Sequence, residues 1–498
     1  MTTTFAPEVA TAQEPLRHPW RWLALICLVH LALATAFNLA TPAATRDQHN
    51  PDENAHMLYI AQLASGHLPV FKDGSNAYES HQPPLYYALA VPVYELSKGA
   101  GPEAATRAVR GFTSLLGVLL LVGAFLAIRA LYPSEPRVAL ATAGFIALIP
   151  MNCNLSGSVT NDVLVDLLIV VGLWRLTALC VGPPGSSSPD DRTKVADTRP
   201  LKRQVRANKA TGILETHDAK HVKAQVDSSP ANTRSLLRRE AAVLGAVLGL
   251  AILTKTSGLL LAPAIVVAFG FLAWRKLADA TSVGVAFLIC FGVALVIAGP
   301  WLIRNTMLYG DPLAQTLFLK SFKATAHADV LISLLGGFNN YCVADAQWTF
   351  ASFWGVFDSM RLFYGYDPTV PGPTPSKPLA LPYGILFGLG MAGLVGFIGT
   401  LRRSDTRPSQ PQQAMLWAML VLVLATLYSF FMFNMTFFQA QGRYWYPSLL
   451  PLAFVFAMGF RGYYPQKGWL NAVYTVLALL MVGLNIYTIA VLLPQRYV

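Results

Sequence analysis

Charged residues are scarce in this sequence. Asp, Glu, Lys and Arg make up 13% of its 498 residues, while 54% are hydrophobic; a soluble domain carries about 25% charged residues. Several stretches of about twenty residues hold almost no charge, and such a stretch can cross a bilayer core of roughly 30 Å as a helix. The shortage of charge excludes a large soluble domain and predicts an all-α polytopic membrane protein.

Cysteine is also scarce, and no two cysteines have the spacing of a metal site or a redox motif. All but the last of the five lie within or at the ends of apolar stretches: Cys27, Cys153, Cys180, Cys290 and Cys342. A free cysteine in such surroundings behaves as a small hydrophobic side chain, so we interpret these as packing residues. No convincing cleavage site follows the first apolar stretch, and we expect that stretch to be retained as a span.

Acidic residues are fewer than basic ones, with 26 Asp and Glu against 37 Lys and Arg and a formal net charge of +11. In a soluble protein this excess would suggest binding to nucleic acid. Here the basic residues concentrate between apolar stretches, as the positive-inside rule expects of cytoplasmic loops. We therefore predict membrane lipids as partners, and no nucleic acid.

Eleven apolar stretches are predicted to span the membrane. They lie at 20–40, 107–130, 137–153, 162–180, 240–254, 257–274, 281–303, 379–400, 413–434, 445–460 and 469–493. A further apolar stretch at 83–96 begins with two prolines and contains Pro92. At 1.5 Å per residue its roughly fourteen residues would cover only about 21 Å, so we expect it to lie in the membrane interface.

Segment 182–239 sets the orientation of the chain. It holds twelve Lys or Arg against six Asp or Glu and is rich in Ser, Pro and Thr, so we predict a disordered, basic, cytoplasmic loop. A role for it in lipid-headgroup binding stays open. Residues 1–19 then form a cytoplasmic N-terminus in a cytoplasmic (inner) membrane, and the C-terminus is external. Residues 20–180 are expected to form the core, with an outer loop at 41–106. Residues 240–498 are expected to hold the remaining transmembrane helices, with an outer loop at 304–378.

Polar residues gather on the predicted outer face. They share a position in the first outer loop or at the outer end of an apolar span: Asp52, Glu53, His56, Glu79, His81, Asn161, Asp162, Lys255, Arg304, Asn305 and Arg443. Polar groups close to the membrane are energetically costly and usually functional. We expect this set to contain the site of any chemistry.

Two interpretations of these residues stay open. A carboxylate can act as a general base or hold a divalent metal, and Lys or Arg can neutralise a phosphate leaving group. Alternatively, Asp52 and Glu53 only cap a short helix at 52–66, the cations are snorkelling interface anchors, and the histidines make ordinary polar contacts. The full set suits a lipid-phosphate-linked substrate attacked at the outer membrane face.

Eight short motifs resemble the GT-C class of integral-membrane glycosyltransferases. Within that class the similarity is to protein O-mannosyltransferases and lipid A aminoarabinose transferases. The motifs are P-D-E-N-A-H at 51–56, E-S-H-Q-P-P-L-Y-Y at 79–87, S-G-S-V-T-N-D at 156–162, L-G-L-A-I-L-T-K at 248–255, G-P-W-L-I-R-N at 299–305, L-Y-G-D-P-L at 308–313, S-F-W-G-V-F at 352–357 and Q-G-R-Y-W-Y-P at 441–447. Each is weak alone, but their order and topological positions are fairly specific.

The resemblance implies a GT-C fold with two juxtamembrane helices, at 52–66 and 83–96, and a polyprenyl-phosphate or pyrophosphate sugar donor used outside the cytoplasm. It implies that the acids Asp52 and Glu53 act on the acceptor or bind metal, with Glu79 as a second loop carboxylate. The spacing departs from the aminoarabinose transferases, because three residues separate Glu79 from the following Pro-Pro. The departure leaves metal use and the donor sugar undecided.

Roles are also expected for the remaining residues, and the resemblance supports those of Lys255, Arg304, Arg443 and Asp162. Those expected to bind the donor phosphate are Lys255, Arg304, Asn305 and Arg443; those expected to orient the acceptor or a metal are His56, His81, Asn161 and Asp162. A divalent ion (Mg, Mn or Zn) would use Asp52, Glu79 and Asp162. The acceptor, whether glycan, lipid or protein, would be recognised chiefly by the outer loop 304–378.

Two other function classes compete with a glycosyltransferase. One is a transporter or flippase for a lipid-linked substrate, although such proteins usually show internal repeats, and none is evident here. The other is a non-catalytic lipid-binding assembly protein on the same scaffold, which the loss of the carboxylates would have favoured. Transfer of a labelled sugar from a polyprenyl-phosphate donor distinguishes all three.

Overall fold

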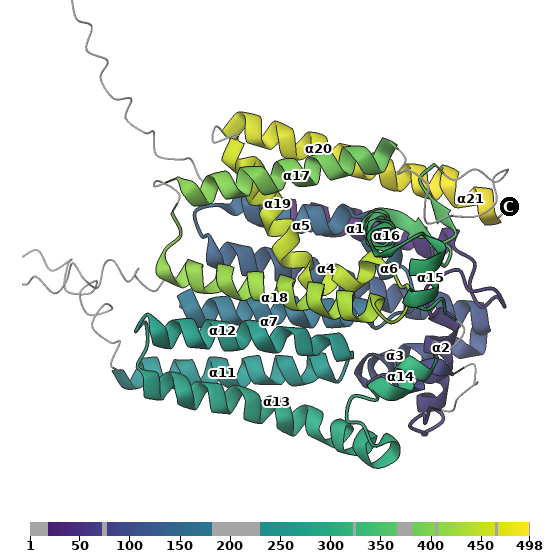
Figure 1. Ribbon diagram of the computed structural model, residues 1–498, viewed down its shortest axis with the longest axis horizontal. Helices are drawn as coiled ribbons and strands as arrows, with labels where there is room; N and C mark the ends of the chain where they lie inside the picture. The colour runs from purple at the N-terminus through teal and green to yellow at the C-terminus, as the bar shows by residue number, and fades with distance from the viewer. Residues whose placement is uncertain are drawn as a thin grey trace, which may run out of the picture.

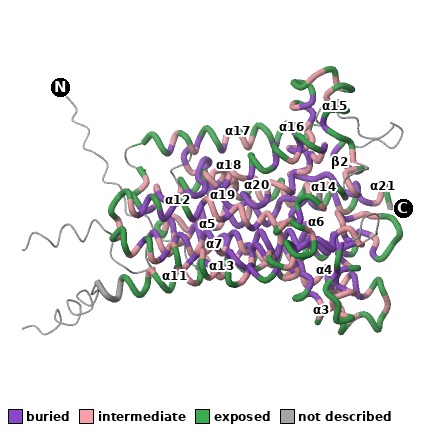
Figure 2. The backbone as a smooth tube through the Cα atoms, turned by 60° about the horizontal axis from the view of Figure 1, so that its bottom comes forward, coloured by how far each residue is buried: buried purple, intermediate pink, exposed green. Residues whose placement is uncertain are grey.

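A computed structural model describes residues 18–71, 77–181, 230–321, 325–365, 381–403, 407–463 and 467–497. Within these ranges almost every element is a helix, and the long helices run side by side in one elongated bundle (Figure 1). The buried residues follow the middle of this bundle, and peripheral helices such as α17 are largely exposed (Figure 2). The all-α architecture predicted from the sequence is confirmed.

The long helices and the segments continuous with them are α1 Pro19–Ala40, α4 Pro102–Leu131, α5 Pro136–Leu148, α6 Pro150–Ser156, α7 Asp162–Val181, α11 Pro230–Ile252, α12 Leu261–Trp274, α13 Ala280–Tyr309, α17 Leu381–Arg402, α18 Gln410–Asn434, α19 Leu449–Tyr463, α20 Lys467–Tyr487, a π-helical turn Thr488–Leu492 and α21 Pro494–Tyr497. The shorter elements are α2 Glu53–Ala64, α3 Leu85–Ser97, α14 Gln315–Ser321, α15 Ala328–Leu334, α16 Phe338–Gly355, the antiparallel strands β1 Val356–Phe357 and β2 Leu362–Phe363, and 3₁₀ turns at Tyr78–His81, Lys98–Ala100, Thr256–Leu260 and Gly442–Ser448.

Eight helices in the described part of the chain are long and apolar enough to cross a membrane, and the bent pair α5–α6 is a ninth candidate. Their outer surfaces are apolar: in α13, for example, Leu288, Leu295 and Val296 are 64–75% exposed, as expected of side chains that face lipid. The predicted spans 240–254 and 445–460 correspond to α11 and α19, which pack against α13 and α17. The polytopic membrane fold is confirmed, and the number eleven stays a prediction.

The chain breaks between α5 and α6, where the sequence predicted one continuous span. The two helices meet at Pro150 at an angle of 69°, because proline cannot donate the hydrogen bond that would continue the helix. Carbonyl groups released by the break are satisfied by side chains: Asn152 Nδ2 donates to Ile146 O at 2.9 Å, and His30 Nδ1 lies 2.8 Å from Ala147 O. The break turns α6 across one end of the bundle.

Two boundaries differ from the prediction. Residues 230–239, predicted as the end of a disordered loop, form the first turns of α11, and an ion pair between Arg175 and Glu240 links this part of α11 to α7. The rest of that predicted loop, 182–229, lies outside the described residues. Helix α13 also continues through Pro300 to Tyr309, so Arg304 and Asn305 lie within the helix.

Segments predicted to lie on one membrane face do meet at one end of the bundle. Helices α2, α3, α6, α14, α15 and α16 gather there, whereas the turn between α12 and α13 lies at the other end (Figures 1 and 2). We name the first of these the site end. Its position on the outer side of the membrane stays a prediction.

Candidate functional site

Asp52 precedes α2 at the site end, but it does not cap the helix. Its backbone is left-handed, with φ 58°, and its side chain makes no capping hydrogen bond. Instead, Arg443 Nη2 donates to Asp52 Oδ2 at 2.8 Å, and the Tyr78 hydroxyl donates to Oδ1 at 3.1 Å. The carboxylate is therefore held by a cation from the other end of the sequence.

Arg443 connects two carboxylates. Besides Asp52, it contacts Asp162 at the start of α7, with 3.4 Å between Nη1 and Oδ2, and Asp162 forms a second ion pair with Lys255. We name these four residues the ion chain. Their side chains are largely buried, and Asp52 is the most exposed at 30%. The sequence analysis predicted that all four lie together, and the structure places them in direct contact.

Charges within the ion chain control its protonation. Burial would raise the pKa of the Asp52 carboxyl, but the charge and hydrogen bond of Arg443, together with His56 and the Tyr78 hydroxyl, outweigh burial and hold that pKa below its usual value. Burial would lower the pKa of Lys255, and the neighbouring Asp162 raises it instead. Asp52 and Lys255 are therefore charged at neutral pH, as is arginine in any protein.

Glu79 and two histidines lie next to the ion chain. Glu79 is buried, its Oε2 has no hydrogen-bond partner in the described part of the chain, and burial raises its pKa. His56 Nδ1 lies 2.9 Å from the Tyr87 hydroxyl, and burial lowers its pKa. His81 Nδ1 lies 2.7 Å from the carbonyl of Tyr78, and burial lowers its pKa to about 4. Both imidazoles are neutral at pH 7.

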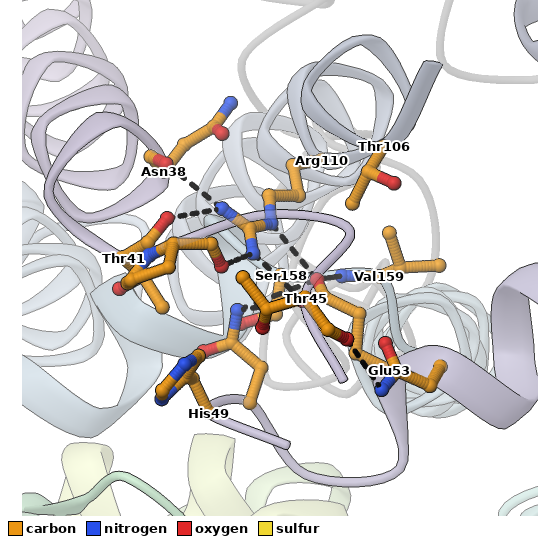
Figure 3. Close-up of polar contacts among 12 residues, drawn as sticks. Asn38, Thr41, Thr45, His49, Glu53, Thr106, Arg110, Ser158 and Val159 are labelled. Atoms are coloured by element: carbon orange, nitrogen blue, oxygen red, sulfur yellow. Dashed lines mark hydrogen bonds and ion pairs between the residues drawn. The ribbon is translucent and has the colours of Figure 1, made fainter. Parts of the chain in front are cut away.

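Glu53, the second acid of the predicted pair, is engaged elsewhere. Arg110 in α4 donates to both carboxylate oxygens, from Nη2 at 2.7 Å and from Nε at 2.9 Å (Figure 3). The backbone N–H of Val159 and the amide of Asn50 also donate to Glu53. With its acceptor positions occupied in this way, Glu53 joins the first loop to α4 and to the segment before α7.

Arg110 is a buried charged residue of the site end that the sequence analysis missed. Its remaining N–H groups donate to the carbonyl of Asn38 in the last turn of α1 and to those of Thr41 and Pro42 just after it, at 2.8–2.9 Å (Figure 3). The sequence does show a charged residue, Arg110, inside the predicted span 107–130. The sequence analysis did not single it out because the span as a whole is apolar.

Arg304, Asn305 and Asn161 have partners outside the ion chain. Arg304 Nη2 donates to Pro69 O at 2.7 Å, its guanidinium lies 4.8 Å from the Trp301 ring centroid, and its buried Nη1 has no partner among the described residues. Asn305 donates to the carbonyl of Pro312, and Asn161 donates to Thr254 O at 3.3 Å. These contacts hold neighbouring segments together at the site end.

A cavity of about 190 Å³ opens beside the ion chain. Asp52 and Arg443 form part of its wall, together with residues from 48–51, from α6, from 352–360 and from 441–442. The sequence analysis expected the outer loop 304–378, which contains the β1–β2 turn, to recognise the acceptor, but it did not single out residues of this turn or of α6. Because one carboxylate and one guanidinium share this wall, a substrate there would meet both a base and an anion-binding group.

The β1–β2 turn is fastened to the chain just before Asp52. Its three residues Asp358, Ser359 and Met360 all have positive φ, between 49° and 69°, a conformation that costs energy in residues other than glycine. Asp358 accepts from His49 Nδ1 at 2.8 Å and from Arg496 Nε in α21 at 2.7 Å. The ion pair with Arg496 connects the cavity wall to the last helix, and the hydrogen bond with His49 connects it to the chain before Asp52.

The predicted metal site has no matching arrangement here. Within the described ranges, no group of three or more His, Cys, Asp or Glu side chains is placed to hold a metal ion. Asp52 and Asp162 face cations instead. The residues proposed as ligands do not fit a metal in this arrangement, and no step below uses one.

No protein-family model and no curated protein sequence matches the chain. Several solved structures are similar to it in fold. The archaeal oligosaccharyltransferase AglB from Archaeoglobus fulgidus, in complex with an inhibitory peptide and a dolichol-phosphate, is similar with a TM-score of 0.52 at 14% identity, over 96% of this chain and 56% of that one. The same enzyme in complex with Zn and sulfate gives a TM-score of 0.52 at 15% identity, over 94% and 52% of the two chains.

ArnT from Cupriavidus metallidurans bound to undecaprenyl phosphate is similar with a TM-score of 0.47 at 15% identity, over 95% of this chain and 71% of that one. This chain spans just over half the length of AglB, the archaeal enzyme. At this identity the similarity to AglB establishes architecture. The chain has the fold of the GT-C integral-membrane glycosyltransferases.

Proposed function

We propose that this protein is a glycosyltransferase that moves a sugar from a polyprenyl-phosphate or pyrophosphate donor to an acceptor at the outer face of the cytoplasmic membrane. The observation that carries the proposal is the pairing of Asp52 with Arg443 on the wall of one cavity at the end of a membrane-spanning bundle. The GT-C fold supports it, and so does the dolichol-phosphate held by the archaeal enzyme of that fold.

Arg443 and Lys255 are the proposed phosphate-binding groups. Both are held at the cavity end of the bundle by carboxylates, which a phosphate can replace as the partner of a guanidinium or ammonium. Fixed cations of this kind stabilise the charge that develops on a phosphate leaving group. Arg304 is proposed as an additional contact for the donor, because its buried Nη1 lacks a partner among the described residues.

Asp52 is the proposed general base. In the transfer step, the bond between the sugar carbon and the phosphate oxygen breaks while a bond to the acceptor oxygen or nitrogen forms. The phosphate leaves as an anion, and the acceptor proton passes to Asp52. A general base positioned in this way typically increases the reaction rate by about 10²–10⁴-fold. Glu79 is proposed to orient the acceptor, and Glu53 is proposed to hold the loop that carries Asp52.

The test is transfer by purified protein in vesicles supplied with polyprenyl-phosphate-linked radiolabelled sugars and a membrane extract as the acceptor source. We expect label to leave the lipid and enter a product, and Asp52→Asn to lose most of this transfer. Movement of an intact labelled lipid across the bilayer without cleavage would identify a flippase instead. Lipid binding with neither outcome would identify a non-catalytic protein.

A further inference from the structure

Asn154 in α6 is a largely buried polar residue whose side-chain amide is unpaired within the described part of the chain. The residue is only 4% exposed and lines the cavity beside the ion chain. Its backbone carbonyl accepts from Ser158, but its side-chain amide makes no hydrogen bond to any other described residue. Its amide atoms are not among the side-chain atoms that are sealed from solvent, so the unpaired amide on this wall is accessible to a ligand in the cavity.

The other uncharged polar side chains of the cavity wall are already engaged. Ser352 accepts from Gly442 N, Gln441 accepts from Arg443, Ser359 donates to the carbonyl of Gln48, and the Gln48 amide pairs with Tyr78. Among the described residues that form the wall, Asn154 therefore offers an unused amide. The same wall carries Asp52 and Arg443.

A neighbouring asparagine shows what a structural amide looks like in this helix. Asn152, two residues earlier, is also buried, and its Nδ2 donates to Ile146 O at 2.9 Å across the break before α6. Asn152 therefore supplies a hydrogen bond to a backbone carbonyl that the helix break leaves without its usual partner. Asn154 has no comparable contact among the described residues, although it lies in the same short helix and is also buried.

We propose that Asn154 is a substrate-binding residue that recognises a sugar hydroxyl seated in the cavity beside Asp52. A carboxamide has both donor and acceptor atoms, and so does a hydroxyl group, so the two can form hydrogen bonds in either direction. A phosphate only accepts, and arginine suits it better. The hydroxyl belongs either to the donor sugar or to a carbohydrate acceptor. This inference rests on the proposed function.

The test compares Asn154→Leu with Asn152→Leu, a pair matched in residue type, helix and burial. Binding of bare undecaprenyl phosphate and of a panel of undecaprenyl-phosphate-linked hexoses and pentoses is measured by native mass spectrometry, alongside transfer kinetics and melting temperature. Asn154→Leu should leave the melting temperature and the binding of bare lipid unchanged. Asn152→Leu should lower the melting temperature, because it leaves the Ile146 carbonyl unsatisfied.

Two results support the inference and identify the source of the hydroxyl. If Asn154 contacts the donor sugar, Asn154→Leu weakens binding of the sugar-bearing lipid by about tenfold or more, as loss of one good hydrogen bond predicts. If it contacts the acceptor, lipid binding is unchanged and the KM for acceptor rises by a similar factor. An Asn154→Gln variant should recover part of the loss, because it restores the amide.

Other results overturn it. If Asn154→Leu matches the wild type in all these measurements, or loses bare and sugar-bearing lipid equally, Asn154 does not recognise a hydroxyl. A wild-type protein that binds no polyprenyl phosphate and transfers no sugar overturns the proposed function, and this inference with it. Since that outcome is visible in the wild type alone, the two failures are distinguishable.

Discussion

Residue 52 must adopt a left-handed backbone conformation and must also supply a carboxylate to Arg443. Its φ of 58° is a left-handed conformation that Asp and Asn adopt more readily than most residues. An alanine there would combine loss of the carboxylate with backbone strain. Asparagine keeps the conformation and the size, so it removes only the charge and the capacity to accept a proton.

We predict that Asp52→Asn folds normally and loses about 10²–10⁴-fold of the transfer rate, the usual contribution of a general base. The measurements are single-turnover transfer with labelled donor, melting temperature, and binding of undecaprenyl phosphate. Melting temperature should be near that of the wild type, and the lipid should still bind, because Arg443 remains. Near-full activity in this variant would show that Asp52 is not the base.

Glu53 is predicted to stabilise the folded protein and to take no part in the transfer reaction. Glu53→Gln leaves the guanidinium of the fully buried Arg110 without its counter-charge, and removing one partner of a buried pair typically costs about 3–5 kcal/mol. Denaturant unfolding of the purified protein measures this. A variant of unchanged stability that has lost transfer would instead place Glu53 in the reaction, as the sequence alone allowed.

Glu79 is predicted to make stability depend on pH. Burial raises its pKa, so between the usual carboxyl pKa and the raised value the folded protein keeps a proton that the unfolded chain has released. Stability therefore falls as pH rises through that window. Glu79→Gln removes this dependence, so it should melt higher than the wild type above the window and equally below it. Parallel melting curves at all pH values would contradict the assignment.

The residues that the sequence revealed and those it hid differ in a physical way. Asp162, Lys255 and Arg443 stood out because each lies at the end of an apolar span, where an unpaired charge is costly. Asp52 stood out because it lies in the polar loop that follows the first span. Arg110 lies inside such a span and was counted as part of it. Which carboxylate pairs with which cation depends on contacts across hundreds of residues, and no local pattern records these.

At the scale of elements, the crossing of α17 and α19 depends on glycine. A Cβ added to Gly459 would collide with the backbone of Gly393, and one added to Gly396 would collide with the backbone of Gly459. Small residues of this kind let membrane helices approach closely. This contact helps to position α19, and with it the 3₁₀ turn that carries Arg443.

We predict that Gly459→Ala destabilises the protein by about 1–3 kcal/mol, the usual cost of overpacking. Gly399→Ala in α17 is the control, because nothing lies within 4 Å of its added Cβ; it should be neutral or stabilising, by up to about 1 kcal/mol, through helix propensity. Unfolding in detergent measures both. Equal effects would mean that the close contact is not formed.

Helices were easier to predict than the segments between them. Apolar length alone located most spans, and α3 at 85–97 closely matches the interfacial segment predicted at 83–96. The α5–α6 break was missed because Pro150 lies in an apolar run that is otherwise long enough to span. The β1–β2 turn gave no signal either, since its three left-handed residues include no glycine.

At the scale of the whole molecule, the orientation of the bundle in the membrane can be determined by labelling its two ends. The two ends of the bundle carry suitable labelling positions: Ser65 follows α2 at the site end, and Ser134 lies between α4 and α5 at the other. Both are exposed. The partly exposed Cys342 would be replaced by Ser to remove the native background.

We predict that a membrane-impermeant maleimide added to intact cells labels Ser65→Cys and not Ser134→Cys. The physical reason is the positive-inside rule, which places the basic loops, including the one around Ser134, in the cytoplasm. Permeabilised cells provide the control, since both positions should then react. The reverse pattern in intact cells would invert the topology and place the cavity in the cytoplasm.

The ion chain has a consequence for the order of events. Its two cations and two carboxylates balance one another, so without substrate Arg443 is occupied by Asp52 and its carboxylate is not free to accept a proton. Under the proposed function, an incoming donor phosphate would compete for Arg443 and, in taking it, would release Asp52. The acceptor would then meet a competent base only after the donor has bound. In kinetic terms, the proposal implies a compulsory-order sequential mechanism with the donor first, in which the counter-ion keeps the resting protein from reacting without its donor.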